Sequence, residues 1–366
     1  MKRAPWFGRA VESWLQEVLA VHFDPAQGTP YWLKREKELG ISVLRQVRSV
    51  ADLKVFGPMP ERDLADTPLE QFIPAALLRT KKRLIVCETA GTAGNPKVTA
   101  YLDSEFRYAF PEFFAYVARE RRFPIGVNWA FIGPSGPHII FKSAQTMARA
   151  LSSMEPFAVD FDPRWIKKME PGSAGFERYK RHVLEQALRI FHTQEVGVLF
   201  TTPPLALDLA HTLPAPTRQR VRGIHLGGLP LSPADYQAIQ ANFPNAVVIP
   251  GYGNTLFGLT LELTPSRDGS ICYFPPGPRL VLKVVPQQDD AAPGDRIGRE
   301  VPVGDRGQVM FHRLDKCCFI PNMLERDEAQ RVRMPEPWKA LGLCSDGVKD
   351  PGPSLKNGVP IREGLY

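Results

Sequence analysis

The residues whose types and spacing could support chemistry are concentrated in one short stretch, residues 88–99. It reads Glu88-Thr89-Ala90-Gly91-Thr92-Ala93-Gly94-Asn95-Pro96-Lys97-Val98-Thr99. Glycines let a backbone approach a ligand closely, threonine hydroxyls can donate to phosphate oxygens, and a lysine supplies a positive charge. Because the apolar residues 84–87 precede it, the stretch is typical of a strand that leads into an exposed loop. It predicts a loop that binds a polyanion, and a simple turn followed by a lysine is the alternative.

The spacing of this loop does not match the two commonest nucleotide-binding loops. It has neither the G-x-G-x-x-G pattern of dinucleotide-binding folds nor the G-x-x-x-x-G-K-S/T pattern of many ATPases. Glu88 is unfavourable for phosphate binding, since a carboxylate repels phosphate unless it points away or is neutralised.

Composition indicates an ordered globular protein. A chain of 366 residues with 43% hydrophobic content can bury a large core, and its length suggests two or three subdomains. The net charge of +7 is compatible with an anionic ligand such as a nucleotide. The basic residues are spread along the chain and no nucleic-acid module appears, so a solvated basic surface is favoured and no nucleic-acid partner is expected.

The sequence favours a reduced, cytoplasmic protein. The N-terminus lacks the apolar core of a signal peptide, and no apolar run reaches the roughly 18 residues of a membrane span. The five cysteines include no C-x-x-C pair, which favours free thiols. Cys317 and Cys318 are adjacent, and neighbours on a strand point to opposite faces, so no metal site is expected there.

Hydrophobic spacing predicts how the chain is arranged around the loop. Residues 11–23 and 31–47 have helical spacing, and the aromatic-rich residues 103–121 predict a buried helix, in which core packing of the rings is favoured over ligand stacking. Short apolar strands then alternate with helices; the strands are 127–132, 197–201, 223–226 and 246–249, and the helices 143–153, 177–192, 204–212 and 233–242. This order predicts parallel strands with crossover helices, and ligands at the carboxyl ends of the strands. Residues after 259 are expected to be rich in β-strands, and residues 342–366 to form an irregular tail.

Residues 89–97 resemble the phosphate-binding motif of the acyl-adenylate-forming superfamily. That motif is commonly Thr-Ser-Gly-Thr-Thr-Gly-x-Pro-Lys. The positions that match it are Thr89, Gly91, Thr92, Gly94, Pro96 and Lys97. The resemblance implies that these residues bind the phosphates of ATP.

Two further stretches resemble the adenine-binding parts of the same superfamily. Residues 221–231 are similar to the strand and glycine pair that lie along the adenine, which implies a contact from Gly228; a simple turn is the alternative. Residues 250–255 resemble Tyr-Gly-x-Thr-Glu, which implies that Tyr252 and Gly253 lie at the adenine and Thr255 at a phosphate. The glutamate position is Leu256, which offers no oxygen to Mg²⁺, so the metal would be held by the triphosphate, water or another carboxylate.

The later motifs are looser. Residues 304–309 resemble a Gly-Glu-x-Gly-x-Leu/Val turn. Residues 322–327 lie where the superfamily has Tyr-Arg-Thr-Gly-Asp, which implies that Asp327 accepts hydrogen bonds from the ribose. Residues 342–352 can be laid on the hinge motif, with Ser345 in place of its first aspartate.

The resemblance implies an α/β fold, the large N-terminal domain of an adenylate-forming enzyme. Mixed, largely parallel sheets flanked by helices would form it, with a smaller β-rich subdomain. We expect a large domain over residues 1–350, divided into a helical cap (1–80), an α/β core with the nucleotide loop (81–258) and the β-rich subdomain (259–340), followed by a tail (351–366). The mobile C-terminal domain of the superfamily is expected to be absent.

The function implied is ATP-dependent activation of an organic, aromatic carboxylic acid as an acyl-adenylate, with Lys97 and Thr255 as catalytic residues. The sequence is most similar to the phenylacetate-CoA ligase branch and to compact acyl-activating proteins, including those of phenazine antibiotic pathways. The acid is expected beside the adenine strand; the residues predicted to contact it are Phe131, Gly133, His138 and Gly251. A structural histidine is the alternative for His138.

The implied ligands are ATP or AMP, Mg²⁺ and the acid. A partner reductase, an acyl acceptor or a separate C-terminal domain would take up the adenylate in a secondary-metabolite pathway, and the protein is expected to be a monomer or homodimer. A non-catalytic nucleotide- or acid-binding protein is the alternative, favoured by Leu256, and an ATPase or kinase that uses the same loop is a third.

Overall fold

The computed structural model describes residues 8–80, 82–89, 95–266, 268–287, 293–343 and 345–353. Gly91, Thr92 and Gly94, which are predicted to bind phosphate, lie outside the described residues. The chain divides into two compact units. The first unit comprises Met1–Cys87, Lys97–Phe106 and Phe274–Ser354, and the second Glu88–Pro96, Arg107–Tyr273 and Leu355–Tyr366. The domain boundaries given above remain predictions.

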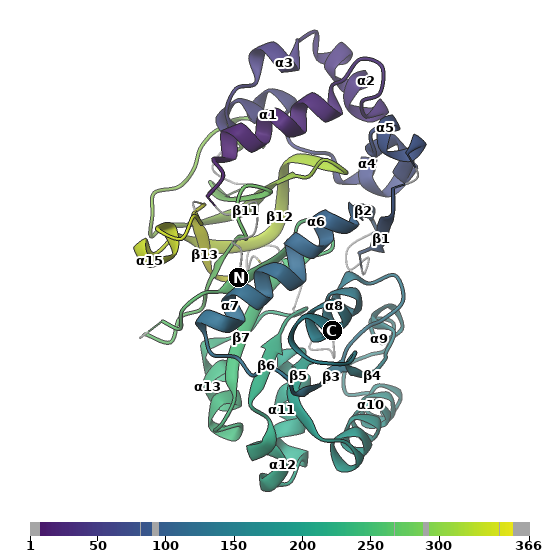
Figure 1. Ribbon diagram of the computed structural model, residues 1–366, viewed down its shortest axis with the longest axis vertical. Helices are drawn as coiled ribbons and strands as arrows, with labels where there is room; N and C mark the ends of the chain where they lie inside the picture. Colours follow the sequence, from purple (N-terminus) through teal and green to yellow (C-terminus); the bar gives the residue numbers. More distant parts are fainter. Residues whose placement is uncertain are drawn as a thin grey trace. The chain divides into compact units, whose positions relative to one another are not determined.

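A parallel sheet forms the centre of the second unit (Figure 1). Its strands are, in spatial order, β4 (Phe157–Val159), β3 (Asn128–Ile132), β5 (Val196–Thr201), β6 (Gly223–Leu226) and β7 (Val247–Asn254). Every residue of β5 and β6 is buried, because helices cover both faces of a parallel sheet of this kind. The predicted parallel strands with crossover helices are confirmed.

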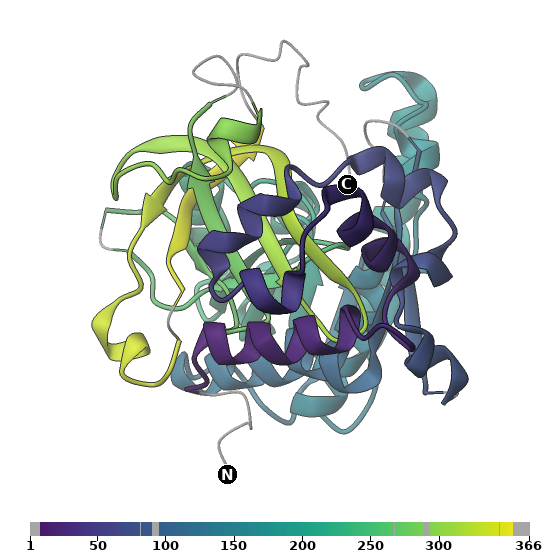
Figure 2. The same cartoon turned by 90° about the horizontal axis from the view of Figure 1, so that it is seen from above.

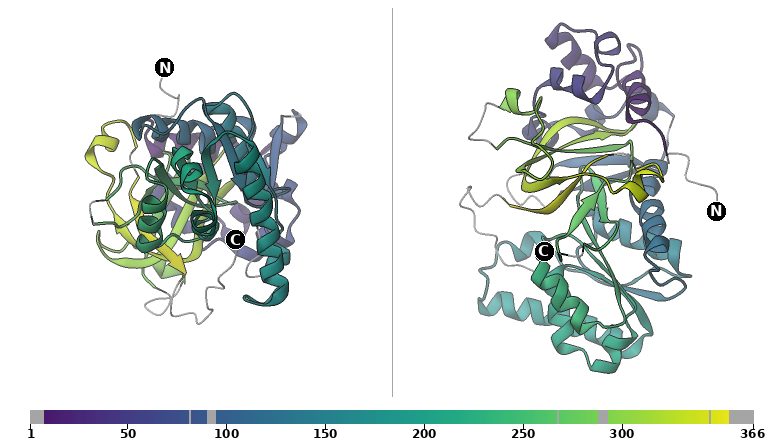
Figure 3. Two further views of the ribbon diagram at one scale, coloured as in Figure 1. Left: turned by 90° about the horizontal axis from the view of Figure 1, so that it is seen from below. Right: turned by 90° about the vertical axis from the view of Figure 1, so that its left-hand side faces the viewer.

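Helices of the second unit connect these strands (Figure 3). They are α8 (Ile139–Leu151), α9 (Pro163–Ile166), α10 (Ala174–Thr193), α11 (Pro203–Thr212), α12 (Ala215–Arg220) and α13 (Pro233–Asn242). After β7 the chain turns back into the antiparallel strand β8 (Gly258–Glu262), and β9 (Cys272–Phe274) follows.

The predicted aromatic helix is present with an internal irregularity. It consists of α6 (Asp103–Arg107), a π-helical segment (Tyr108–Glu112) and α7 (Phe113–Glu120). Pro111 lies in the π-helical segment, where its missing N–H disturbs the regular α-helical bonding. The rings of Phe113 and Phe114 are fully buried, as expected for core residues.

The first unit is built on four antiparallel strands in the order β10-β11-β12-β13. They are β10 (Leu280–Val285), β11 (Arg306–Leu314), β12 (Phe319–Val332) and β13 (Gly347–Pro353). Short helices α14 (Pro293–Arg296) and α15 (Glu336–Lys339) lie in the connections. The β-rich texture predicted after residue 259 is confirmed.

Helices from the N-terminal part of the chain pack on one side of this sheet (Figures 2 and 3). They are α1 (Val11–His22), α2 (Pro30–Leu39), α3 (Val43–Gln46), η1 (Val50–Phe56), α4 (Glu61–Asp66), η2 (Leu69–Phe72) and α5 (Ala75–Arg79). Phe23, Trp32 and Phe56 surround Phe319 at the start of β12, and the indole N–H of Trp32 donates to the Phe319 carbonyl at 3.0 Å. This aromatic cluster joins the helices to the sheet.

Two expectations about local structure are wrong. The predicted helix 31–47 is divided into α2 and α3, because Gly40 takes a left-handed conformation (φ 64°) that ends α2. The predicted irregular tail contains β13, whose residues pair with β12 from Asp327 to Val332. Pairing with the preceding strand β12, rather than local propensity, makes this segment a strand.

Strands β1 (Leu84–Glu88) and β2 (Val98–Leu102) pair with each other and frame the predicted phosphate loop. Within the described ranges, none of the helices combines the length and apolar composition that crossing a membrane requires.

Candidate functional site

The carboxyl edge of the parallel sheet carries three of the predicted ligand-binding segments. Phe131 of β3 pairs with Phe200 of β5, which pairs with His225 of β6, which pairs with Ile249 of β7. Two residues beyond this row lie Gly133, Gly227 and Gly251, at the same level of β3, β6 and β7. Because parallel strands present their carboxyl ends at one edge, these glycines lie along that edge, where the order of elements predicts ligands.

The backbone of Glu88, where β1 ends, joins two other segments of the second unit. Its N–H donates to the Pro137 carbonyl at 3.0 Å. Its carbonyl accepts from the hydroxyl of Thr255 at 3.3 Å. The beginning of the predicted phosphate loop is therefore in contact with the loop before His138 and with the Thr255 turn, and Thr89 follows directly.

The carboxylate of Glu88 is paired with a cation. Its Oε1 lies 3.5 Å from Nη1 of Arg164, and both side chains are partly exposed. Arg164 also contacts Asp162 Oδ1 through Nε at 3.2 Å. The pairing meets the condition under which a glutamate next to a phosphate loop is tolerated, namely that its charge is neutralised.

Tyr252, Gly253 and Thr255 lie in and directly after β7, which forms a tight hairpin with β8. Gly253 pairs with Leu259, and a Cβ at position 253 would lie 2.1 Å from the Gly258 carbonyl oxygen, so only glycine fits there. The side-chain oxygen of Asn254 accepts from the N–H groups of Leu256 and Phe257 at 2.9 and 3.1 Å. This turn fixes where Thr255, which is buried, can point.

Tyr252 and Gly228 have the exposure that a contact with a planar base requires. The Tyr252 ring is half-buried, with its centroid 5.7 Å from that of Phe257 and 5.8 Å from that of Tyr273. Its carbonyl accepts from Thr260 Oγ1 at 2.6 Å, which secures the strand. Gly228 is exposed and has φ 88°, a left-handed conformation that accounts for glycine at this position.

Leu256, at the position of the superfamily's glutamate, is 2% exposed. Its side chain is buried and offers no oxygen, so position 256 does not fit a ligand to Mg²⁺. Among the residues that the structure describes, no group of three or more His, Cys, Asp and Glu side chains is arranged to bind a metal ion.

The residues predicted to contact the acid are brought to one edge but differ in access. Phe131 is 1% exposed, and its ring covers Gly133, where an added Cβ would lie 2.6 Å from Phe131 Cζ. A Cβ at Gly251 would lie 2.8 Å from Leu259 Cδ1 and 2.9 Å from the imidazole of His225. Close packing therefore explains the glycines at 133 and 251 independently of any ligand.

His138 is the residue directly before α8, and its side chain is 4% exposed. Its Nε2 is buried and has no hydrogen-bond partner among the described residues. Burial, and next the positive charge of Arg164, lower the pKa of His138. The imidazole is thus neutral at pH 7 and retains a polar atom that a ligand could satisfy.

Lys97 and Asp327 belong to the first unit. Lys97 directly precedes β2, and its ammonium lies 2.6 Å from Glu61 Oε2 at the start of α4. Asp327 is a half-buried residue of β12 opposite Pro353 of β13. Their predicted contacts with phosphate and ribose remain predictions.

Sequence reasoning missed Arg164 and His225. Arg164 follows Asp162, which caps α9, and that local pattern gives no sign of the pairing with Glu88. His225 lies inside an apolar strand, where its ring packs between Phe114 and Phe200 and its Nδ1 lies 2.7 Å from the Ile249 carbonyl. A polar residue within an otherwise apolar strand was the available signal.

Comparison with known proteins identifies solved structures that have a similar fold. No protein-family model and no curated protein sequence matches the chain. An open conformation of 2-hydroxyisobutyryl-CoA ligase in complex with 2-HIB-AMP and CoA is similar over 98% of this chain and 77% of that one, with a TM-score of 0.66 and 15% identity. The thioesterification state of that ligase gives a TM-score of 0.64 and 17% identity over 94% of this chain and 66% of that one. The predicted α/β fold is thereby confirmed, and the chain shares the fold of this ligase over the matched residues.

Proposed function

We propose that this protein activates an organic carboxylic acid with ATP. A carboxylate oxygen attacks the α-phosphorus of ATP, the bond to the β-phosphate breaks, and an acyl-adenylate and pyrophosphate are formed. The observation that carries the proposal is the double contact of the Glu88 backbone with Pro137 and Thr255, which gathers the beginning of the phosphate loop, the loop before His138 and the adenine hairpin.

The chain's own residues would act by positioning and by stabilising charge. Lys97 and Thr255 stabilise the negative charge that builds up on the phosphates. The remaining nucleotide contacts come from residues of the phosphate loop, the adenine segments and β12, namely Thr89, Gly91, Thr92, Gly94, Gly228, Tyr252, Gly253 and Asp327. No step in this scheme depends on a protein ligand to Mg²⁺, because Leu256 cannot supply one; the metal would bind through the triphosphate and water.

We propose an aromatic acid as the substrate. Phe131 lies at the sheet edge with the ring centroids of Phe141 and Phe200 at 5.4 and 5.3 Å, and Phe141 in the first turn of α8 is only half-buried. Aromatic rings favour edge and offset contacts with one another, which supports a ring as the ligand. As a neutral imidazole, His138 would bind the acid by a hydrogen bond rather than an ion pair.

The fate of the adenylate rests on the sequence resemblance alone. We propose that a partner reductase or another acyl acceptor consumes it in a secondary-metabolite pathway, of the kind in which phenylacetate-CoA ligase-like proteins and phenazine-pathway proteins act. Such a handover would protect the adenylate from hydrolysis.

A second candidate is a nucleotide- or acid-binding protein without turnover. Two observations favour it: the buried Leu256 at the usual metal-ligand position, and the ion pair between Lys97 and Glu61, which occupies the lysine. Adenylation requires Lys97 to exchange this carboxylate for phosphate.

The test is acid-dependent exchange of labelled pyrophosphate into ATP over a panel of aromatic and aliphatic acids. We expect exchange with aromatic acids and a loss of at least about 100-fold in Lys97→Ala, as when one charge-stabilising donor is removed from an active site. Lys34→Ala is the matched control, because Lys34 is an exposed helical lysine in the same unit. ATP binding measured by calorimetry without exchange for any acid would favour the second candidate.

A further inference from the structure

Three consecutive residues of β2 are held by one side chain, Arg313 at the end of β11. Its Nη1 donates to Thr99 Oγ1 at 2.7 Å and its Nη2 to the Ala100 carbonyl at 2.5 Å. Its guanidinium carbon lies 3.8 Å from the centroid of the Tyr101 ring. Backbone, hydroxyl and aromatic face of the strand are therefore all engaged by the same planar cation.

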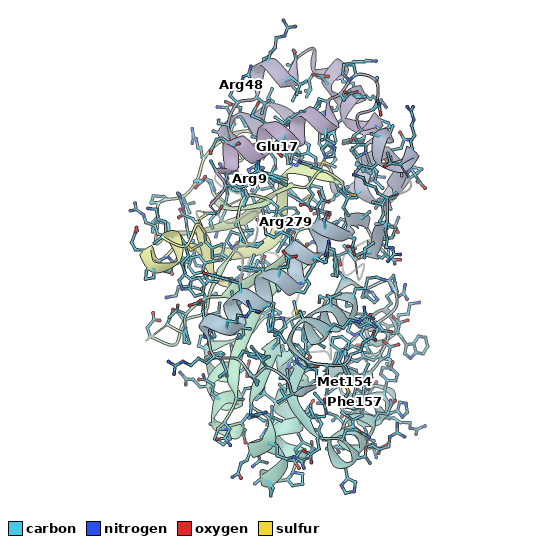
Figure 4. All side chains as sticks on the ribbon, in the orientation of Figure 1. Arg9, Glu17, Arg48, Met154, Phe157 and Arg279 are labelled. Atoms are coloured by element: carbon cyan, nitrogen blue, oxygen red, sulfur yellow. The ribbon has the colours of Figure 1, made fainter. Side chains whose placement is uncertain are left out.

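Arg313 is itself held in place by a buried network of ion pairs. Its Nε donates to Asp315 Oδ2 at 2.6 Å, and Arg279, labelled in Figure 4, contacts both oxygens of that carboxylate at 2.8 and 2.5 Å. All three side chains are 0% exposed. Nε2 of His22 lies 2.9 Å from the Asp315 carbonyl, which ties the cluster to α1.

The buried charges of this cluster do not cancel. Two buried guanidinium groups face one aspartate, and burial, followed by the charge of Asp315, raises the pKa of the nearby Glu105 to about 7. Glu105 accepts from the backbone N–H groups of Lys316 and Cys317 at 2.6 and 3.3 Å. A buried group of ions costs more to form than an apolar core of the same volume, so it is weak evidence for a role in stability alone.

We infer that Arg313 is a positioning residue for Lys97, which immediately precedes β2. Arg313 contacts Thr99, Ala100 and Tyr101 and so fixes the position of the start of β2. The position of β2 in turn determines which phosphate positions the Lys97 ammonium can reach. Arginine suits this task because its rigid fork fixes a geometry that a lysine ammonium cannot. The inference rests on the proposed function, in which Lys97 binds the phosphates of ATP.

The test uses substitutions on β2 rather than removal of the buried arginine, which could prevent folding. Thr99→Val is close in shape and removes the hydroxyl that accepts from Arg313, whereas Thr99→Ser keeps it and loses a methyl group. We expect Thr99→Val to weaken ATP binding, measured by calorimetry, by at least about five-fold through misplacement of Lys97, and Thr99→Ser to bind like the wild type. A role in packing alone predicts the opposite order.

Two further variants test whether the loss of ATP affinity in Thr99→Val depends on Arg313 and on Lys97. The Thr99 hydroxyl also lies 3.7 Å from Cys318 Sγ, so Cys318→Ala should leave ATP affinity unchanged if Arg313 is the partner that matters. In the Lys97→Ala background, Thr99→Val should have no additional effect, because a double-mutant cycle reports coupling between the two sites. Faster hydrogen exchange of residues 95–102 in Thr99→Val is expected as the direct sign of a loosened strand.

The outcomes distinguish the inference from the proposed function. If the wild type binds ATP and Lys97→Ala weakens binding, but Thr99→Val binds normally, the inference is overturned while the function stands. Equal losses in Thr99→Val and Thr99→Ser also overturn it. If the wild type does not bind ATP, the proposed function is wrong, and the role of Arg313 toward a phosphate site is wrong with it.

Discussion

The β7–β8 hairpin gives the sharpest prediction, because the two strands can pair at Gly253 only if that residue has no side chain. Replacing that hydrogen by the methyl group of alanine would put a carbon 2.1 Å from the Gly258 carbonyl oxygen, 3.1 Å from the Gly258 carbonyl carbon and 3.2 Å from Leu259 Cα. All three neighbours are backbone atoms of the facing strand, so no side chain can move aside.

The expected cost of Gly253→Ala follows from this geometry. The facing backbone would have to withdraw by roughly 1 Å, which is comparable to an overpacked core and costs about 1–3 kcal/mol. Withdrawal also lengthens a cross-strand hydrogen bond, with a net contribution of about 1 kcal/mol. We therefore expect the free energy of unfolding to fall by about 2–4 kcal/mol. Thr255 lies two residues on, so pyrophosphate exchange should be lost as well.

The assay is urea unfolding followed by circular dichroism, with Gly294→Ala as the matched control. Gly294 lies in α14, and an added Cβ there meets no atom within 4 Å. The control should be neutral or slightly stabilised, since alanine is the better helix former. If Gly253→Ala unfolds within about 0.5 kcal/mol of the wild type, the hairpin accommodates a methyl group, and the steric reasoning is refuted.

Three other perturbations test charges that the structure pairs or buries. Glu61→Gln removes the carboxylate 2.6 Å from Lys97, so ATP should bind up to about five-fold more tightly in calorimetry, the worth of a partly exposed ion pair. Asp315→Asn leaves two buried guanidinium groups short of an anion and should cost about 3–5 kcal/mol in urea unfolding, against about 1 kcal/mol or less for Asp346→Asn, whose arginine pair is partly exposed. Burial lowers the pKa of His225 to about 4, so its contribution to stability is complete above the unfolded pKa of 6.5. That contribution is lost as the pH falls from 6.5 toward 4, by at most about 1.4 kcal/mol per pH unit, and His225→Phe should flatten the pH dependence of stability.

Each of these has an opposing result. Weaker ATP binding in Glu61→Gln would mean that the carboxylate orients Lys97 instead of competing for it. Equal losses in Asp315→Asn and Asp346→Asn would show that burial does not set the cost of removing one partner. An unchanged slope between pH 6.5 and 4 in His225→Phe would exclude that histidine as the source of acid sensitivity.

The spacing of apolar residues in the sequence was enough to predict the strands and helices whose formation depends on nearby residues. The mostly apolar runs at 197–201 and 223–226 became β5 and β6, because a strand covered on both faces is built mainly of apolar side chains. The alternation of these runs with helical segments was enough to predict parallel strands and ligands at their carboxyl ends. Gly253, predicted for its likeness to an adenine-binding motif, is also required by close backbone packing that no pattern revealed.

Only the tertiary structure decided which charges meet. Glu88 and Arg164 are 76 residues apart, and Arg313 and Thr99 are 214 apart, so neither pairing leaves a periodic trace in the sequence. The same holds for residues 347–353, which look irregular by composition and become a strand because β12 offers them hydrogen-bond partners. Periodicity reports which face of an element is buried. The partner of a buried charge is set by how distant elements pack.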